Sequence, residues 1–374
     1  MRTRNLLLLA ALGSTVLATA QNLAVNVETA GTLKDNVKIG LTVSGKIDKT
    51  DFNYLDAFAG LKTLDLKDVT IEAYTADNGK VYTIAEIPDS AFMTSSYINP
   101  NGVTVFTGNK SIESVVLPAS IITIGSSAFN SSVATSIDFS NCSQLALIKD
   151  HAFDLAGMEK IDLSGLAALK TIEAYAFDQT HATTIVLDGC SALETLDERA
   201  FCQSYFVTST SFKGLTSLKS IGNRAFLNLG KTSGDAGVVD LTACSALETI
   251  DESAFQSAKI TGVKFPASLK TIGAKAFNLA ANIAEITFEG AVPPELGATA
   301  FTSKVMAGAT VYVPAGSEEA YKALGFENVQ SATIVASARI QTEDSNAPAY
   351  DLQGRQATAN TRGIVVQDGV KTVK

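Results

Sequence analysis

The sequence predicts a mainly β solenoid of short stacked strands, capped at both ends and followed by a small β tail. The stretch Leu-Lys-Thr-Ile-Glu-Ala-Tyr-Ala-Phe at 169–177 recurs along the chain with a fixed internal spacing. One unit holds two short extended pieces and a turn, which is too little chain to bury its own apolar side chains. Stacked units would form one continuous core, and 46% hydrophobic residues supply the material for it.

An Ala-Phe pair marks each unit. The pairs that end at Phe129 and Phe201 enclose three gaps of 24 residues, and the later gaps are 25, 29, 22 and 24 residues. A Leu or Ile stands eight residues before most of these phenylalanines, as Leu169 does before Phe177. Because equivalent positions lie above one another in a solenoid, we predict a buried column made of Phe129, Phe153, Phe177, Phe201, Phe226, Phe255, Phe277 and Phe301.

The chain starts with the features of a secretory signal peptide over residues 1–20. Arg2 and Arg4 precede a short apolar run at 6–12, and Ala18-Thr19-Ala20 is typical of a cleavage site before Gln21. An N-terminal membrane anchor is the alternative, but the apolar run is short for a bilayer span. No later stretch of about 18 apolar residues occurs, so we expect no transmembrane span in the mature chain.

Residues 21–80 are predicted to form an N-terminal cap, because the first turn of a solenoid has no neighbour above it. Residues 37–43 alternate apolar and polar side chains, as a half-buried strand does. Asp48 or Asp51 can then cap a short helix that carries Phe52 and Leu55, and a strand resumes at 64–66. Residues 70–110 are less regular, with a polar loop at 99–102.

The repeats are predicted to run over 81–331 and to finish in a closing cap. Ser317 can cap a short helix with acidic residues in its first turn, and Gly325 can end it. Residues 332–348 are rich in Ser, Ala and Thr and read as a linker. Residues 349–374 predict two or three short strands joined by glycine turns.

Three motifs are specific to this repeat: Leu-Lys-Thr-Ile-x-x-x-Ala-Phe at 169–177 and 269–277, the Ser-Ala-Leu-Glu-Thr units at 191–195 and 245–249, and the closing segment around 311–317. On these residues the chain resembles the BspA-like leucine-rich repeat family of bacterial surface proteins. The resemblance implies a right-handed leucine-rich repeat solenoid and adhesion to host matrix, host cells or other bacteria. The tail at 349–374 resembles the sorting tails of type IX secretion, with a plain terminal hairpin as the alternative.

The sequence contains no recognisable catalytic, cofactor or metal motif. It has only two histidines, His151 and His181, and no nucleophile elbow, His-Glu-x-x-His pair or phosphate-binding glycine loop. Cys142, Cys190 and Cys244 share one position of the repeat, which favours small core residues over a metal or redox site. We therefore expect no cofactor, no metal and no enzyme activity. Cys202 lies outside this column and has no assigned place.

Aspartates recur in the middle of the predicted strands, on the side away from the core. Asp138 and Asp162 would be stacked, so a weak divalent-cation site between them is conceivable. A solvated acidic face, continued by Asp240, is the interpretation we favour. The net charge of −9 argues against nucleic acid as a partner, because phosphates require clusters of Lys and Arg.

The position two residues before each phenylalanine varies in chemistry and predicts an outward-facing column. Such a column is usually a solvated surface, but stacked variable side chains can also form an extended contact stripe. The solvated surface is the interpretation we favour for such a mixed column. If the column is a contact stripe, Tyr175, Arg199 and Arg224 are its expected anchors, because aromatic and Arg side chains often anchor interfaces. The candidate contact residues are His151, Tyr175, Arg199, Arg224 and Lys275.

These observations predict a monomeric, secreted scaffold displayed on the cell surface or the exterior of the outer membrane. Its partner would be a protein or a glycan on a host or bacterial surface. A carbohydrate-capture module is the first alternative, and clustered aromatic side chains would favour it. An enzyme is the second, and a deep pocket with converging carboxylates would be its sign.

Overall fold

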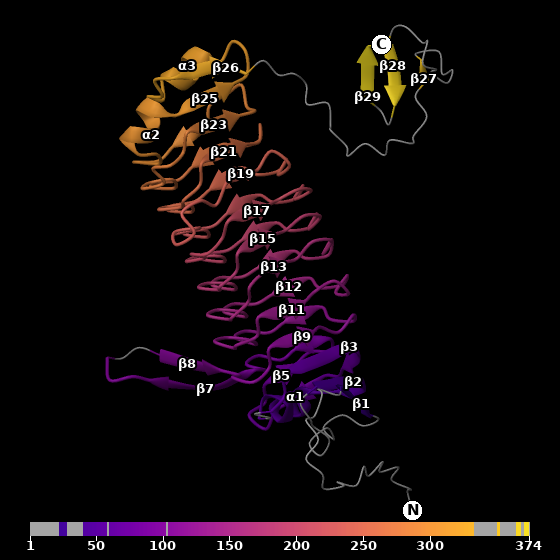
Figure 1. Cartoon of the computed structure of the whole chain (residues 1–374). Coiled ribbons are helices and arrows are strands. Elements are labelled where there is room, and N and C mark those ends of the chain that lie inside the picture. Colours follow the sequence, from indigo (N-terminus) through magenta and orange to yellow (C-terminus); the bar gives the residue numbers. More distant parts are fainter. Residues whose placement is uncertain are drawn as a thin grey trace, which may run out of the picture.

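The computed structural model describes residues 22–27, 40–57, 60–101 and 104–332, together with three short strands near the C-terminus. These residues form an elongated solenoid with a cap at each end (Figure 1). The predicted signal peptide at 1–20 and nearly all of the predicted linker at 332–348 lie outside the described residues.

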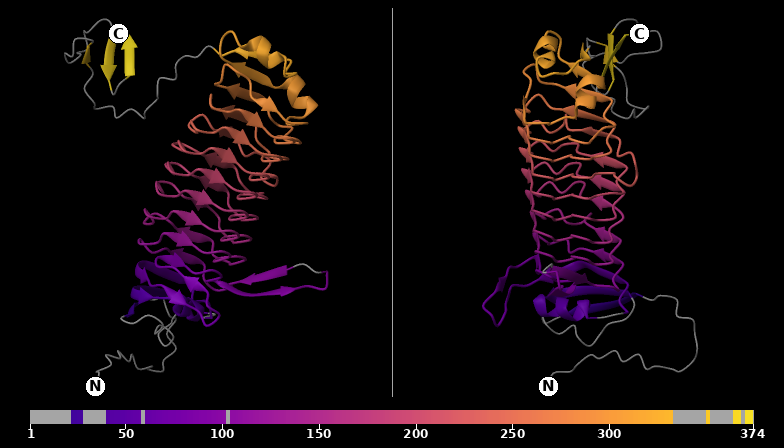
Figure 2. Two further views of the ribbon diagram at one scale, coloured as in Figure 1. Left: turned by 180° about the vertical axis from the view of Figure 1, so that it is seen from behind. Right: turned by 90° about the vertical axis from the view of Figure 1, so that its left-hand side faces the viewer.

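Each turn of the solenoid contributes one strand to each of two walls (Figure 2). The first wall is a nine-stranded parallel sheet in which every strand is only two residues long. In chain order its strands are β6 (Glu86–Ile87), β10 (Thr123–Ile124), β12 (Leu147–Ile148), β14 (Thr171–Ile172), β16 (Thr195–Leu196), β18 (Ser220–Ile221), β20 (Thr249–Ile250), β22 (Thr271–Ile272) and β24 (Glu295–Leu296).

The second wall is divided into three parallel sheets, which follow one another along the solenoid. The N-terminal sheet contains β1 (Asn22–Val27), β2 (Gly40–Ile47), β3 (Thr63–Ile71), β9 (Ser114–Val116) and β11 (Ser136–Asp138). The middle sheet contains β13 (Ile161–Asp162), β15 (Thr184–Val186) and β17 (Ser209–Ser211). The C-terminal sheet contains β19 (Val238–Asp240), β21 (Gly262–Phe265), β23 (Glu285–Phe288), β25 (Thr310–Val313) and β26 (Val329–Ser331).

A column of phenylalanine rings runs through the core between the walls. It starts at Phe92, continues through the eight phenylalanines at the predicted core positions and ends at Phe301. Consecutive ring centroids lie 4.8–5.3 Å apart. This spacing is close to the distance between paired strands, so each turn adds one ring directly above the last.

The N-terminal cap closes the bottom of this column. Helix α1 (Lys49–Asp56) begins with a capping box, in which the Asp48 side chain accepts from the backbone of the first turn and Asp51 accepts from the Asp48 N–H. The buried Phe52 of α1 meets Phe92 edge to face at 5.8 Å. The helix therefore covers the first exposed ring of the column.

Two β-hairpins occupy the region that the sequence left irregular. One is formed by β4 (Tyr74–Thr75) and β5 (Val81–Tyr82), the other by β7 (Met93–Ile98) and β8 (Thr104–Gly108). Of the polar loop predicted at 99–102, residues 99–101 follow β7 directly, and residue 102 lies outside the described residues. The strands were missed because β7 has a largely polar sequence with little period-two hydrophobicity.

The C-terminal cap contains α2 (Ser303–Gly308) and α3 (Glu318–Lys322). Tyr321 of α3 is fully buried, and its hydroxyl donates to the Gly290 carbonyl at 2.7 Å. Phe326 packs against the last ring of the column, at 5.5 Å from Phe301. Ser317 lies at the N-cap of α3, as predicted, but its hydroxyl makes no capping bond and donates to the Pro314 carbonyl instead.

Three short antiparallel strands are described in the tail, as the sequence predicts. They are β27 (Tyr350–Asp351), β28 (Ile364–Gln367) and β29 (Val370–Val373).

Candidate functional site

The contact stripe lies on the turn that follows each strand of the nine-stranded wall. Every stripe position has a left-handed backbone, with φ between 53° and 60° from Ser127 to Lys275. Its N–H donates to a carbonyl of the next turn at 2.9–3.1 Å, and the phenylalanine two residues later donates to the next alanine at 2.7–2.8 Å. The alanine between them is fully buried. These bonds fix the turn, so the stripe side chain is free to vary.

Three stripe side chains stack directly on one another. The rings of His151 and Tyr175 lie 4.6 Å apart at an interplanar angle of 15°. The guanidinium of Arg199 covers the other side of Tyr175, at 4.9 Å from the ring centroid. Tyr175 therefore lies between the stripe side chains of the two neighbouring turns. Because both of its faces are covered, the stack presents ring edges and polar groups to solvent.

The stack continues onto the β7–β8 hairpin, where the Phe106 ring lies 6.5 Å from His151. Phe106 is 45 residues away from His151 in sequence and is not part of a repeat unit. No periodic signal in the sequence could have placed it beside the stripe.

Two buried aspartates bind the first and last side chains of the stack. His151 Nδ1 lies 2.9 Å from Asp154 Oδ2, and Arg199 donates through Nη2 to Asp178 Oδ2 at 2.8 Å. Asp154 and Asp178 are only 6% and 1% exposed. Sequence reasoning missed both, although an available signal was the polar residue that directly follows the core phenylalanine in consecutive units.

The surroundings of the stack shift the pKa values of its histidine and of one supporting aspartate. The hydrogen bond to Asp154 raises the pKa of His151 above its ordinary value. Burial raises the pKa of Asp178 to about 6, and the bond from Arg199 offsets this only in part. The neighbouring Asp154 charge acts in the same direction as burial. The electrostatics of the stack therefore depend on pH near neutrality.

The remaining candidate residues of the stripe are more exposed and have more distant ion-pair partners. Arg224 and Lys275 have side chains that are 45% and 52% exposed, against 21% for Arg199. Their carboxylate partners lie at 4.0 and 3.9 Å, on Glu198 and Glu252. The stripe thus has a fixed, stacked half near the hairpin and an adaptable cationic half towards the C-terminus.

The repeat profile of the BspA type leucine rich repeat region matches six copies in this chain, over residues 102–233 and 210–331. The chain belongs to the BspA-type leucine-rich repeat family. The predicted leucine-rich repeat fold is confirmed, in a mainly β solenoid of about 11 turns. A search of curated proteins finds no match to the sequence.

Several solved structures resemble this BspA-type protein at low identity. A leucine-rich repeat protein from Bacteroides ovatus is 17% identical with a TM-score of 0.37, and the match covers 67% of this chain and 63% of that one. The pneumococcal vaccine antigen PcpA is 18% identical with a TM-score of 0.33, covering 72% and 89% of the two chains. A leucine rich cell surface protein from Faecalibacterium prausnitzii is 14% identical with a TM-score of 0.18, covering 70% and 86%. None of these likenesses bears on function.

The strand aspartates of this BspA-type solenoid act as local caps. The Asp138 carboxylate accepts from the Ser140 N–H, and Asp162 accepts from both Ser164 and Lys160. Within the described part of the chain, no group of three His, Cys, Asp or Glu side chains is arranged to hold a metal ion. The aspartates are accounted for by turns that begin after each strand.

The four cysteines are buried thiols. Cys190 Sγ donates to the Leu163 carbonyl at 3.1 Å, and Cys142 lies 3.6 Å from the Pro118 carbonyl. Cys202, which the sequence left without a place, follows the buried Phe201 in the same column as Asp178. Burial raises the pKa of the Cys202 thiol to about 12, so it stays protonated at neutral pH.

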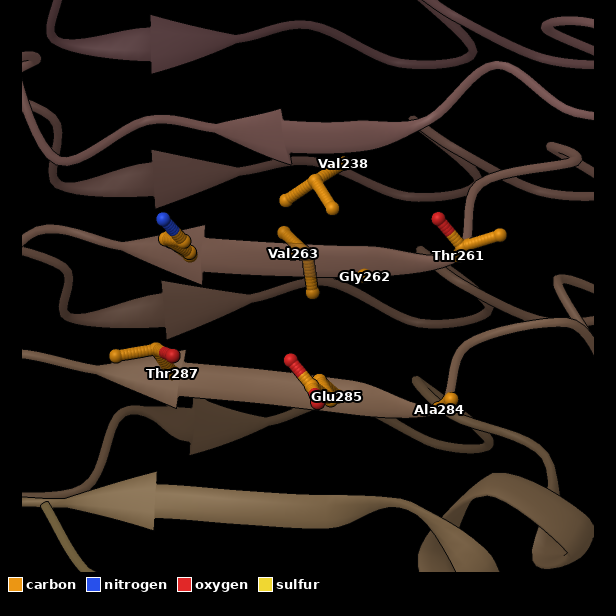
Figure 3. A pocket seen from close by; sticks show the side chains of 8 residues that line it. Val238, Thr261, Gly262, Val263, Ala284, Glu285 and Thr287 are labelled. Carbon is orange, nitrogen blue, oxygen red and sulfur yellow. The ribbon is translucent and has the colours of Figure 1, made fainter.

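A hollow of about 260 Å³ lies on the outer face of the C-terminal sheet (Figure 3). It forms where Gly262 has no side chain between Val238 and Glu285 of the neighbouring strands. Glu285 is the only carboxylate in its lining, and the nearby Lys264 pairs with Asp240 at 3.2 Å. The hollow therefore presents one carboxylate, whereas glycoside hydrolysis uses a pair.

Across the described residues, no helix has the length and hydrophobicity needed to cross a bilayer.

Proposed function

We propose that this protein is an exported, non-catalytic surface scaffold that binds a protein partner along the turn stripe. The observation that carries the proposal is the stacked group of His151, Tyr175 and Arg199, with its continuation into Arg224 and Lys275. Aromatic and Arg side chains that are already fixed lose little conformational entropy on binding, which suits an interface. Partners on host matrix, host cells or other bacteria are the surfaces that such a scaffold would meet.

The covered faces of Tyr175 favour a protein over a glycan. Sugar recognition by an aromatic platform needs an open ring face, because the apolar side of the sugar packs on it. His151 occupies one face of Tyr175 and Arg199 occupies the other. A ligand can therefore contact a row of ring edges, a tyrosine hydroxyl and cationic groups. An acidic or polar protein surface complements such a row.

The test is a binding array of matrix proteins and glycans probed with the purified protein. We expect selective capture of one or more proteins, at an affinity that weakens as salt rises, since the exposed stripe cations Arg224 and Lys275 would take part. Selective capture of glycans with no protein signal would overturn the proposal in favour of the carbohydrate module.

A further inference from the structure

The β7–β8 hairpin is an arm that projects sideways from the N-terminal end of the solenoid (Figures 1 and 2). In β7 every residue from Thr94 to Ile98 is exposed, including Tyr97 at 57% and Ile98 at 71%. Strand β8 lies on the side of the following turns, where Phe106 meets His151. Strand β7 forms the other edge of the arm.

The outer edge of β7 has no neighbouring strand in the part of the chain that the structure describes. The arm is a sheet of two strands only, β7 and β8. A ribbon of two strands has marginal stability by itself, and an open edge presents unpaired backbone donors and acceptors. A further strand would satisfy them.

The arm carries no charge. From Ser90 to Asn109 the sequence has no Asp, Glu, Lys or Arg, although 18% of the chain is charged and its net charge is −9. Soluble proteins commonly protect open edges with Lys, Pro or inward-pointing charges, and β7 has none of these. A neutral strand that projects from an acidic molecule lets two copies meet without placing like charges opposite each other.

We propose that β7 pairs antiparallel with β7 of a second copy, which joins two arms into a four-stranded sheet across a two-fold axis. The same segment supplies both sides of such an isologous contact, so no cross-strand pair brings two charges together. The arm projects clear of the solenoid, which keeps the two acidic bodies apart. This replaces the expectation of a monomer.

Sedimentation velocity of the purified protein tests the pairing directly. Since the contact is small, we expect a monomer–dimer equilibrium between about 1 and about 500 μM. Dimerisation should strengthen as salt is raised, because screening reduces the repulsion between the bodies. A monomer throughout this range, at low and high salt, overturns the proposal.

A pair of matched variants locates the contact. Ser96→Lys puts a charge on the exposed β7 edge and should lower the association constant at least tenfold. Val292→Lys puts the same charge on a residue that is 80% exposed elsewhere, and should leave the constant unchanged. Equal dimerisation of the two variants would place the contact outside the arm and overturn the proposal.

A cysteine crosslink separates pairing from any loss of the arm's structure. The four native cysteines are buried, so Ser96→Cys adds the one accessible thiol among the described residues. Under mild oxidation it should give a crosslinked dimer, because antiparallel pairing brings the two positions within disulfide range. Val292→Cys should not crosslink above background. Equal yields from both variants would contradict the β7 pairing.

Discussion

At the scale of single residues, the stripe positions combine variable side chains with a strained backbone. A left-handed conformation costs a non-glycine residue about 1–2 kcal/mol. It persists here because the N–H groups of each turn are bound to the next turn, which fixes the conformation whatever the side chain. Apart from Thr299 in the last turn, the stripe positions avoid β-branched residues, the type that tolerates this backbone least.

Lys275→Val tests this account of the turn. Lys275 has φ of 58°, so a β-branched side chain there should lower the free energy of unfolding by about 1–2 kcal/mol. Lys170→Val is the matched control, because this exposed lysine is not among the residues with positive φ. Urea denaturation of the two variants should show a clear loss for Lys275→Val only. Similar losses of unfolding free energy in the two variants would contradict the backbone strain at Lys275.

The buried acid and histidine predict stability that falls as pH rises. The pKa of Asp178 is raised to about 6, so its protonated form favours the folded state and this contribution disappears between about pH 4 and pH 6. The raised pKa of His151 acts in the same direction, since its contribution is complete below its unfolded value and disappears as pH rises through the folded value. Asp178 alone contributes up to about 3 kcal/mol to this decrease in the free energy of unfolding.

Denaturation at several pH values, compared between wild type and Asp178→Asn, measures this contribution. The variant resembles the protonated acid, so its loss of stability between about pH 4 and pH 6 should be smaller than that of wild type. His151→Gln should instead flatten the profile above about pH 6.5. Parallel profiles for all three proteins would contradict the buried-acid interpretation.

At the scale of elements, the repeated units were predictable and the inserted ones were not. The spacing of Leu169, Ile172 and Phe177 predicts one strand and a turn, and the apolar triplet at 161–163 predicts the other strand of the unit, because each apolar position has an equivalent in the next unit. The β7–β8 hairpin has no equivalent, and its polar strands give no period-two signal. Asp154 and Asp178 share a repeat position directly after the core phenylalanine, but this recurrence alone does not show that their side chains turn inward.

Phe177→Ala tests the core column. The ring lies 4.9 Å from Phe153 and 5.2 Å from Phe201 and is fully buried, so its removal should cost about 3–5 kcal/mol by leaving a cavity. Phe206→Ala is the control, because that ring is 38% exposed and should cost much less. A thermal melt in which both variants behave like wild type would refute the structural role of Phe177.

At the scale of the whole molecule, the sequence predicted the architecture more completely than it predicted the candidate site. Periodicity identified the solenoid and placed His151, Tyr175 and Arg199 in one column. It could not show that the three side chains stack, or that Phe106 extends the stack, since these contacts depend on rotamers and on an insertion. The contacts between side chains along the stripe can therefore be identified only from the folded structure.

Export is a prediction at this same scale. If residues 1–20 are a signal peptide, mass spectrometry of the protein from its natural host should find Gln21 at the mature N-terminus. If residues 349–374 sort the protein, their deletion should leave it in the periplasm. Retention of residues 1–20 would contradict export, and unchanged surface display of the deletion variant would favour the terminal hairpin.

The affinity of stripe variants for the captured protein tests the central claim most directly. Tyr175→Ala and Arg224→Ala should each weaken binding about tenfold or more, as substitutions at interface anchors do. Lys213→Ala removes an exposed cation away from the stripe and should leave the affinity unchanged. Equal affinities for all three variants and wild type would show that the partner binds another face of the solenoid.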